Sequence, residues 1–305
     1  MIKTVGVIGL GNMGSSIARG LSESFKVIGF DIDDDKRSSL LQKHGIECID
    51  QLELLVKKVD VIVLSLPNGK ISKEVVSDMV SHMDEKKIIM ETSTVLPTDI
   101  SDMLKICEMK GVEIVDAAIL GGVNHVLESN AEFLVGGNVE IIDRVKPILN
   151  KLGKKVTRMG EIGSGMSAKV ISNAVSHTVM VLITESIALG RKSGISHEKM
   201  YALLNGETTY NRPIDHRFNE RIANGEYSGG MSTLNARKDS TLMLELAQQF
   251  KIPLFTIQSS HTVYEIAQNE GYGELDYAAI AILWEKWCDI SLKRESSEEG
   301  RYETI

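Results

Sequence analysis

A glycine-rich turn between two regular patterns constrains the fold of this chain more than any other feature. The run TVGVIGL at residues 4–10 has the aliphatic and β-branched composition of a buried strand. A helical pattern begins near residue 13, and the segment GLGNMG between them spaces its glycines as GxGxxG. Glycine permits the sharp change of direction that so short a connection needs. A strand, a tight turn and a helix in this order open a β–α–β unit.

The first half of the chain repeats this alternation of strand-like runs and helical patterns. Further strands are predicted at 26–31, 59–67, 87–92, 112–119, 132–137 and 154–159. Helices are predicted at 13–22, 34–44, 70–81, 98–109 and 139–150. Because strands joined by crossover helices run parallel, the pattern predicts an α/β domain with a doubly wound parallel sheet.

The second half of the chain shows helical patterns without strand-like alternation. These patterns cover 165–192, 197–205, 213–223, 231–250, 255–269 and 276–291. We therefore predict an α/β domain at 1–163, an all-helical domain at 164–293 and a frayed polar tail at 294–305.

Composition narrows the class of protein. The 305 residues carry a formal net charge of −8 and no basic stripe that would neutralise nucleic-acid phosphates. The three cysteines are scattered and the histidines lack metal-ligand spacing, so we predict neither a disulfide framework nor a metal site. Polar residues interrupt the apolar stretch 170–190, which predicts a core helix and not a membrane span. The opening segment lacks the features of a signal peptide, and a cytoplasmic protein is expected.

The position of GLGNMG, after a strand and before a helix, is typical of dinucleotide binding. Gly9 would make the turn, Gly11 would let a pyrophosphate approach the backbone, and Gly14 would let the helix pack on the strand. The amides at the helix N-terminus would then face the phosphates. The alternative is a strand-to-helix turn that binds no ligand. The predicted cofactor-binding residues of this turn are Gly9, Leu10, Gly11, Asn12, Met13 and Gly14.

The second strand ends on Asp31, where a carboxylate can accept hydrogen bonds from the adenosine ribose. Its negative charge would repel a 2′-phosphate, so NAD is favoured over NADP. Lys36 and Arg37 follow closely and could reach such a phosphate, which keeps NADP as the alternative cofactor. Asp31 could instead only cap the strand end.

Three further strands end in polar or glycine-rich segments. In an open α/β sheet these carboxyl ends share one edge, where ligands bind. We therefore predict a cleft along this edge. Its predicted residues are Leu66, Pro67, Asn68, Ser93, Thr94, Leu120, Gly121 and Gly122.

The segment GSGMSAKVISN at 163–173 places a lysine near the start of an apolar helix. The helix dipole opposes a cation at this position and burial removes its hydration, so helix stability does not explain Lys169. Both effects lower the pKa of a lysine and make it a better base at neutral pH. Asn173 lies one turn later on the same face. We predict that Lys169 exchanges the hydroxyl proton during hydride transfer while Asn173 holds the hydroxyl; a solvent-reaching lysine is the alternative.

These segments resemble the β-hydroxyacid dehydrogenase family of the 3-hydroxyisobutyrate dehydrogenase type. VGVIGLGNMG resembles the family's opening signature, LPN and ETST its cofactor loops, and GSGMSAKVISN its catalytic segment. ARKDSTLMLELA at 236–247 is similar to a family segment that places Lys238 near the nicotinamide end of the cofactor. The resemblance implies a Rossmann-type domain, an all-α C-terminal domain joined by a long interdomain helix, and a homodimer or homotetramer.

The segment DAAILGGVNHV at 116–126 departs from the family's substrate loop. The family pattern DAPVSGG has its substrate-binding serine where Leu120 stands, and His125-Val126 replaces a GA pair. Gly121 and Gly122 match, and their amides can cradle a carboxylate. Because the hydroxyl is lost, either the substrate group that lies beside Leu120 is less polar, or another residue binds the substrate.

Arg212 is a second candidate for binding an anionic substrate, because its guanidinium can form a bidentate pair with a carboxylate. His216 and Arg217 add positive charge on the following turn. The alternative is that all three are solvated residues of a connecting segment.

The favoured interpretation is an oxidoreductase that transfers a hydride between NAD(P) and a small anionic β-hydroxy acid or the matching semialdehyde. One alternative is an NADPH-preferring reductase of short aldehydes or imines, although imine-reducing relatives usually lack the lysine that aligns with Lys169. Another is a non-catalytic dinucleotide-binding protein, which the presence of both Lys169 and Asn173 disfavours.

Overall fold

The structure is a computed structural model that describes residues 2–83, 87–206 and 213–294. The chain divides into two compact units, one ending at Asn173 and the other beginning at Ala174. The division falls within the long helix α8 (Ser164–Lys192), so the first turns of α8 belong to the first unit. Lys169 and Asn173 therefore lie in the same unit as the glycine-rich turn.

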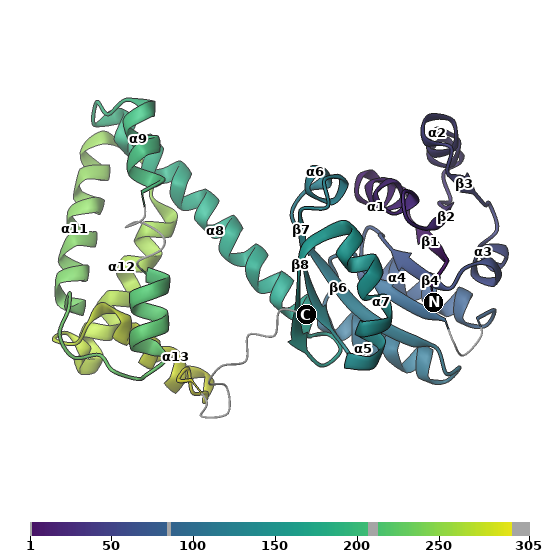
Figure 1. Ribbon diagram of the computed structural model, residues 1–305. Coiled ribbons are helices and arrows are strands. Elements are labelled where there is room, and N and C mark those ends of the chain that lie inside the picture. The colour runs from purple at the N-terminus through teal and green to yellow at the C-terminus, as the bar shows by residue number, and fades with distance from the viewer. Residues whose placement is uncertain (1, 84–86, 207–212, 295–305) are drawn as a thin grey trace. The chain divides into compact units, whose positions relative to one another are not determined.

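The first unit is built on an eight-stranded sheet with the order β3-β2-β1-β4-β5-β6-β7-β8 (Figure 1). Neighbouring strands pair in parallel except β6 and β7. This confirms the predicted doubly wound sheet and adds the two-residue β3, which was not predicted. The strands are β1 (Thr4–Ile8), β2 (Lys26–Phe30), β3 (Glu47–Cys48), β4 (Val61–Leu64), β5 (Ile88–Glu91), β6 (Glu113–Leu120), β7 (Ala131–Gly136) and β8 (Gly153–Gly160).

The antiparallel pairing of β6 with β7 differs from the all-parallel sheet that the sequence predicts. Leu120, the last residue of β6, lies opposite Glu132 near the start of β7. Only residues 121–130, with the short helix α6 (Val123–Leu127), connect the two strands. A parallel crossover needs about a dozen residues or more. The connection is too short for that, so β7 returns alongside β6.

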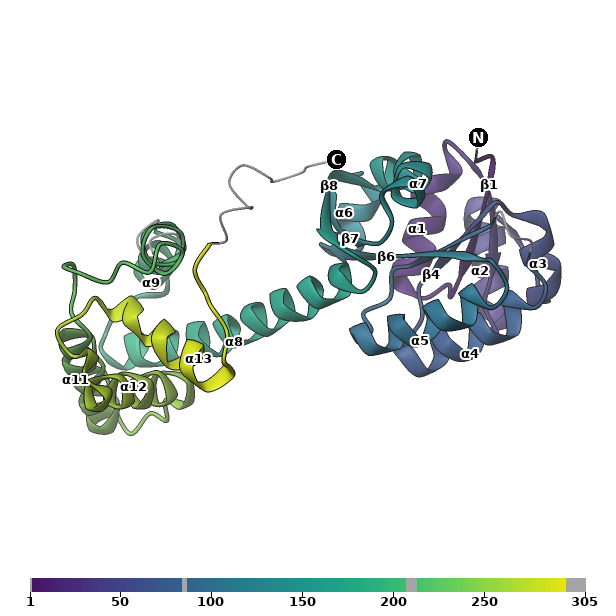
Figure 2. The ribbon, with the colours of Figure 1, turned by 90° about the horizontal axis from the view of Figure 1, so that it is seen from below.

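Helices cover both faces of this sheet, and each face has its own apolar core. Figure 2 shows α4 and α5 on one side and α1 and α7 on the other. All four residues of β4 are buried, as expected for a parallel strand covered on both faces. The remaining helices of the first unit, besides α6 and the start of α8, are α1 (Asn12–Ser22), α2 (Asp34–His44), α3 (Leu52–Lys58), α4 (Gly69–Val80), α5 (Pro97–Glu108) and α7 (Val139–Leu152).

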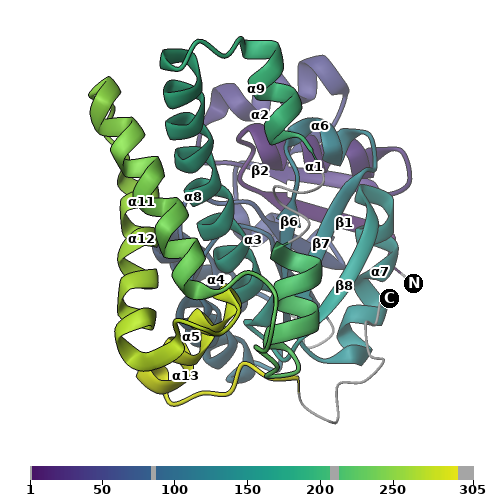
Figure 3. The ribbon, with the colours of Figure 1, turned by 90° about the vertical axis from the view of Figure 1, so that its left-hand side faces the viewer.

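The second unit contains only helical elements among the residues described. Figure 3 shows α11 and α12 running side by side, and the two helices pack against each other. A small core forms around Tyr227, Ala278, Ala279 and Ala281. Besides the rest of α8, the elements are α9 (His197–Leu204), η1 (Pro213–Ile222), α11 (Thr233–Phe250), α12 (Phe255–Ala267), η2 (Gln268–Tyr272), η3 (Tyr277–Ile280) and α13 (Ala281–Cys288).

Helix α8 is more exposed than the sequence predicts. In the part that belongs to the second unit, Val175 and Met180 are each 60% exposed and Val181 is 47% exposed. Among the described helices, α8 alone is long and apolar enough to cross a membrane, a property shared by core helices of soluble proteins. The prediction of a core helix is therefore wrong for this part of the single chain.

Candidate cofactor and catalytic site

In the turn after β1, two glycines are required because backbone carbonyl oxygens of the protein lie too close for a Cβ. The third glycine faces open space. Gly9 has a φ of +90°, and a Cβ there would lie 2.2 Å from the Ser65 carbonyl oxygen. A Cβ at Gly14 would lie 1.8 Å from the Gly9 carbonyl oxygen. A Cβ at Gly11 would meet nothing within 4 Å. The space in front of Gly11 fits a group that approaches the backbone closely, as a pyrophosphate does.

The N-terminus of α1 is open to an anion. Gly11 is its N-cap, no side chain caps the helix, and its first turn contains no acidic residue. The first amides of a helix have no partner within the helix, and the helix dipole favours negative charge there. The residues present therefore fit the pyrophosphate of a dinucleotide.

Asp31 follows β2 and joins the end of that strand to the glycine turn. Its side chain is nearly buried and accepts hydrogen bonds from the amides of Leu10, at 2.7 Å, and Asp33, at 2.9 Å. This is the strand-capping role that the sequence offered as an alternative. Asp31 also lines the cleft beside the turn. A carboxylate has about four acceptor positions, so capping leaves room for ribose hydroxyls.

Lys36 and Arg37 have acidic partners within this segment. Lys36 Nζ lies 3.6 Å from Asp31 Oδ2 and 3.9 Å from Asp33 Oδ2. Arg37 donates through Nη1 to the Asp31 carbonyl oxygen at 2.5 Å and pairs through Nη2 with Asp34 Oδ1 at 2.9 Å. Both side chains are thus paired with acceptor groups of their own segment, residues 31–34.

A cleft of about 380 Å³ lies beside the glycine turn and is lined by residues from three strand ends. Ile32, Ile71 and Val75 also line it and were not predicted from the sequence. Ile32 is 91% exposed next to the nearly buried Asp31, and this apolar surface suits a flat base beside a ribose. The predicted cofactor residues that line the cleft are Gly9, Gly11, Asn12, Met13, Asp31, Leu66 and Pro67.

Ser93 links the ends of β4 and β5. Its Oγ accepts a hydrogen bond from the Leu66 amide, and its own amide donates to Glu91 Oε1, both at 2.7 Å. Burial raises the pKa of Glu91 to about 7, against the lowering effect of Ser93. Of the other predicted cofactor residues, Asn68 caps α4 by accepting from the Ile71 amide, and Thr94 is exposed.

Lys169 and Asn173 share one face of α8. Each is partly buried, whereas Val170 and Ile171 between them are exposed. Met166, one turn before Lys169 on the same face, is fully buried. Burial lowers the pKa of Lys169. The structure thus gives Lys169 the desolvated setting that its predicted role requires, and the role itself stays a prediction.

Asp116 anchors the start of α8 to the sheet. This fully buried residue of β6 accepts hydrogen bonds from the Gly163 amide at 2.6 Å and the Met166 amide at 2.7 Å. Gly165 lies in the same turn, and a Cβ there would meet the Leu134 carbonyl oxygen at 2.5 Å. The first turn of α8, and with it Lys169 one turn later, is therefore fixed on β6 and β7.

The predicted substrate loop follows β6. Leu120 is partly buried, and Gly121 leaves the strand with a φ of +124°. The Gly122 amide donates to Nδ1 of His125 at 3.1 Å. One amide of the predicted carboxylate cradle thus already has an acceptor within the protein, and the role of Gly121 and Gly122 stays a prediction.

Two predicted site residues belong to the second half of the chain. Lys238 lies on α11 in the second unit, 3.4 Å from Asp239 Oδ1. Arg212 lies outside the described residues. Within the described ranges, no three His, Cys, Asp or Glu side chains are grouped so that they could hold a metal ion.

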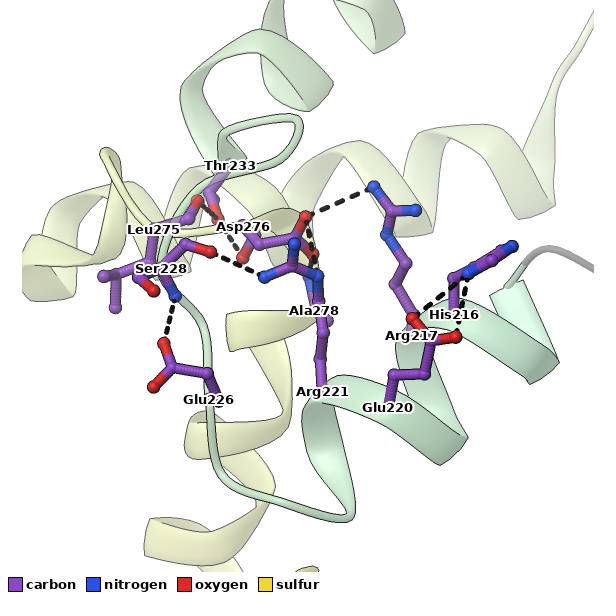
Figure 4. A network of polar contacts seen from close by, with 10 residues as sticks. All are labelled: His216, Arg217, Glu220, Arg221, Glu226, Ser228, Thr233, Leu275, Asp276 and Ala278. Carbon is purple, nitrogen blue, oxygen red and sulfur yellow. Dashed lines mark hydrogen bonds and ion pairs between the residues drawn. The ribbon is translucent and has the colours of Figure 1, made fainter.

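His216 and Arg217 are engaged within the second unit (Figure 4). Arg217 Nη2 lies 3.2 Å and Arg221 Nε 3.5 Å from Oδ2 of the fully buried Asp276. The His216 ring contacts the Glu220 carboxylate at 3.1 Å. These contacts tie η1 to the segment before η3, which favours a structural role for Arg217.

Two protein-family models match the chain. Residues 4–160, which carry the glycine turn and the sheet, match the NAD-binding domain of 6-phosphogluconate dehydrogenase. Residues 163–284, which carry Lys169, match the NAD-binding family of NADP-dependent 3-hydroxyisobutyrate dehydrogenase. The two matches together span both compact units.

Similar proteins match over almost their whole length. The 2-(hydroxymethyl)glutarate dehydrogenase of Eubacterium barkeri is 25% identical over 94% of this chain and 97% of that protein. The mitochondrial 3-hydroxyisobutyrate dehydrogenase of Drosophila melanogaster is 28% identical over 93% and 90%. A solved imine reductase variant from Myxococcus stipitatus has a TM-score of 0.84 at 18% identity, covering 92% of this chain and 99% of that one, and shows the shared fold.

The family matches and the curated relatives thus agree on the chemistry, and they agree across both halves of the chain. The open glycine turn has the space that a dinucleotide needs. The chain belongs to the β-hydroxyacid dehydrogenase family and is an NAD(P)-dependent oxidoreductase of hydroxy acids.

Proposed function

We propose that Lys169 is the general acid/base of a dehydrogenase that acts on a small anionic β-hydroxy acid or, in reverse, on the matching semialdehyde. The observation that carries this proposal is the partly buried Lys169, whose pKa burial lowers. A lysine with its ordinary pKa of about 10.4 is almost fully protonated at neutral pH. A lower pKa increases the fraction of neutral amine, which can accept the hydroxyl proton.

Lys169, Asn173 and Asp116 have different roles in the proposed reaction. The glycine turn around Gly11 would hold the cofactor, whose nicotinamide would supply a hydride acceptor in oxidation and a hydride donor in reduction. Neutral Lys169 Nζ takes the hydroxyl proton as the C–H bond breaks, and the protonated amine gives it to the carbonyl oxygen in the reverse direction. Asn173 holds the reacting oxygen by a hydrogen bond from the same helix face. Asp116 keeps this face in register with the sheet.

We infer a preference for NAD over NADP. Asp31 places a carboxylate on the cleft where the adenosine ribose would lie, and its charge opposes a 2′-phosphate. Lys36 and Arg37, which could offset that repulsion, are paired with Asp31, Asp33 and Asp34. NADP binding would require these pairs to break.

The names of the relatives narrow the substrate class. Both 2-(hydroxymethyl)glutarate and 3-hydroxyisobutyrate carry a primary hydroxyl on the carbon β to a carboxylate. We propose a substrate with this arrangement. The loop Leu120–Gly122 is the proposed carboxylate site, and the roles of Lys238 as a cofactor residue and of Arg212 as an anion ligand stay predictions from the sequence.

We further propose that the protein is a soluble cytoplasmic homodimer or homotetramer. The exposed apolar residues of α8, Val175, Met180 and Val181, support this assembly, because monomeric proteins rarely expose large apolar patches. Sedimentation of the full chain would give the mass of the assembly. A monomer at micromolar concentration would contradict it.

The test of the catalytic proposal follows absorbance at 340 nm with NAD or NADP and a panel of hydroxy acids. The panel contains 3-hydroxyisobutyrate, 2-(hydroxymethyl)glutarate, glycerate and threonate. We expect Lys169→Ala to lose about a hundredfold or more in kcat while NADH still binds. Lys110→Ala, which removes an exposed lysine of the first unit, is the matched control.

The pH profile separates proton transfer from a structural role of Lys169. Oxidation needs the neutral amine, so its rate should rise with pH up to the lowered pKa of Lys169. Reduction needs the protonated amine, so its rate should fall over the same range. In Lys169→Ala both limbs should disappear and added methylamine should restore part of the rate. A variant with wild-type activity would refute the assignment.

A further inference from the structure

The loop after β6 lacks a side-chain donor where an anionic substrate needs one. Leu120 cannot donate a hydrogen bond, and the Gly122 amide is already bonded to His125 Nδ1 at 3.1 Å. The family's serine hydroxyl is thus missing, and one of the two predicted amide contacts with a carboxylate already has an acceptor within the protein. A buried or half-buried carboxylate without donors is costly, so another group must supply them.

The imidazole of His125 lies directly on this loop. A Cβ built on Gly121 would be 3.0 Å from His125 Cβ and 3.1 Å from its Cγ, so the base of the side chain covers Gly121. The ring then reaches the next amide of the loop, that of Gly122. His125 is exposed to solvent, in contrast to its fully buried neighbour Val126. The ring is thus held against the loop and remains accessible to a ligand.

The hydrogen bond to Gly122 fixes which ring nitrogen carries the proton. Nδ1 accepts the Gly122 N–H, so this nitrogen carries no hydrogen in that bond. The neutral ring therefore has its proton on Nε2. Within the described part of the chain, Nε2 has no hydrogen-bond partner. The arrangement leaves one N–H donor available beside the strand end.

Helix α6, which carries His125, is anchored by contacts on either side of it. Val126 packs against α1, where a Cβ on Gly20 would lie 3.4 Å from the Val126 carbonyl oxygen. The His125 carbonyl oxygen accepts from the Asn130 amide at 2.7 Å. Helix α6 is therefore held on both sides, and the imidazole is presented from a fixed position.

We propose that His125 is a substrate-specificity residue, whose Nε2–H donates to the carboxylate of the hydroxy acid in place of a hydroxyl at position 120. This inference rests on the proposed hydroxy-acid function and names the residue that grips the anion. Leu120 then contacts the carbon skeleton, which favours substrates with an aliphatic group beside the carboxylate. His125 has both a capping and a ligand-binding role, through its two different nitrogens.

A matched pair of variants separates these two roles. In His125→Gln and in His125→Glu the side-chain oxygen can accept the Gly122 N–H, because both residues suit this third position of a helix. Gln retains an outward N–H donor, whereas Glu offers only negative charge. Both variants should have the same unfolding midpoint and the same KM for NAD. The KM for the hydroxy acid should rise only a few-fold in His125→Gln and at least about tenfold more in His125→Glu.

A second-site change provides the rescue. Adding Leu120→Ser to His125→Glu returns a hydroxyl to the loop and should lower the KM for the hydroxy acid again. Equal KM values in His125→Gln and His125→Glu would overturn the proposal and leave His125 as a cap only. This result would not affect the hydroxy-acid function, which wild-type turnover tests.

Malonate binding tests the inference without turnover. The probe is titrated calorimetrically into the NADH complexes of wild type, His125→Gln and His125→Glu. At least tenfold weaker binding in His125→Glu than in the other two supports the carboxylate grip, even if no hydroxy acid in the panel reacts. Equal affinity in all three, or no binding to any, overturns it.

Discussion

Asp116, in the middle of β6, accepts a 2.7 Å hydrogen bond from the backbone amide of Met166 in the first turn of α8. Lys169 lies three positions after Met166, so this bond helps to set where the proposed acid/base stands relative to the sheet. The same carboxylate accepts from the Gly163 amide. Burial raises the pKa of Asp116, and the two amides oppose that rise. A single buried carboxylate thus orients the helix start.

Replacing Asp116 with Asn should affect stability and catalysis together. In Asn one carboxylate oxygen is replaced by an NH2 group, which cannot accept the hydrogen bond from the backbone N–H that it faces. We expect the free energy of unfolding to fall by about 3 kcal/mol, because that N–H is left buried without an acceptor. The kcat should fall at least about tenfold, because a 1 Å misplacement of a catalytic group can cost about a hundredfold. Affinity for NADH should stay unchanged, because the glycine turn is elsewhere.

Urea unfolding, kcat and NADH titration of Asp116→Asn would be compared with Asp143→Asn, which removes an exposed carboxylate on α7. A stable Asp116→Asn variant with wild-type kcat would show that α8 is positioned by packing alone.

Glu91 should make the stability of the protein fall as pH rises. Its pKa is raised by burial from 4.5 to about 7, so between these values the folded protein holds a proton that the unfolded chain has released. The free energy of unfolding therefore decreases with pH across this window and levels off above about pH 7. A shift of this size corresponds to about 3 kcal/mol.

The measurement is urea unfolding at several pH values between 4.5 and 8, in wild type and in Glu91→Gln. Gln retains the oxygen that accepts from the Ser93 amide and has no titration in this range. As pH rises, the free energy of unfolding of wild type should fall relative to that of Glu91→Gln. A difference that does not change with pH would place the Glu91 pKa near its usual value.

The glycine turn provides a matched pair that separates folding from cofactor binding. Gly14→Ala would place its Cβ 1.8 Å from the Gly9 carbonyl oxygen, so we expect a loss of stability. Its size should be about 3 kcal/mol or more. Gly11→Ala meets no protein atom within 4 Å and should fold normally. Its methyl group would occupy the space in front of the α1 amides, so the Kd for NADH should rise at least about tenfold.

Thermal unfolding and NADH fluorescence titration would measure the two effects in Gly11→Ala and Gly14→Ala. If Gly11→Ala binds NADH as tightly as wild type, the pyrophosphate does not approach the backbone at this turn.

Local motifs and periodic runs explain how much of this fold is predictable from the sequence. The longer strands and helices follow from apolar periodicity, and the GxGxxG motif and Asp31 predict residues that line a single cleft. Helices α3 and α6 and strand β3 are too short for a periodic signal, and they were missed. Alternation also does not show strand direction, so the reversal at β7 was not predicted.

The rest of the site depends on contacts between distant residues. The links from Glu91 through Ser93 to Leu66 join two strand ends that are far apart in the sequence. Asp116 bonds to Met166 of α8, fifty positions later in the sequence, and the interval contains two further strands. No local pattern encodes such pairs. The apolar composition of α8 likewise does not show whether the same chain covers it.

Asp31 should control the choice of cofactor. Asp31→Ser removes the charge that opposes a 2′-phosphate and also removes the partner that holds Lys36 Nζ at 3.6 Å. We expect the ratio of kcat/KM for NAD to that for NADP to fall by at least about tenfold, which corresponds to about 1.4 kcal/mol. This ratio is insensitive to the amount of folded protein, which matters because Asp31 also accepts from the Leu10 amide. Asp78→Ser, which removes an exposed carboxylate on α4, should leave the ratio unchanged. An unchanged ratio in Asp31→Ser would mean that the ribose lies elsewhere in the cleft and that Lys36 and Arg37 do not face its 2′ position.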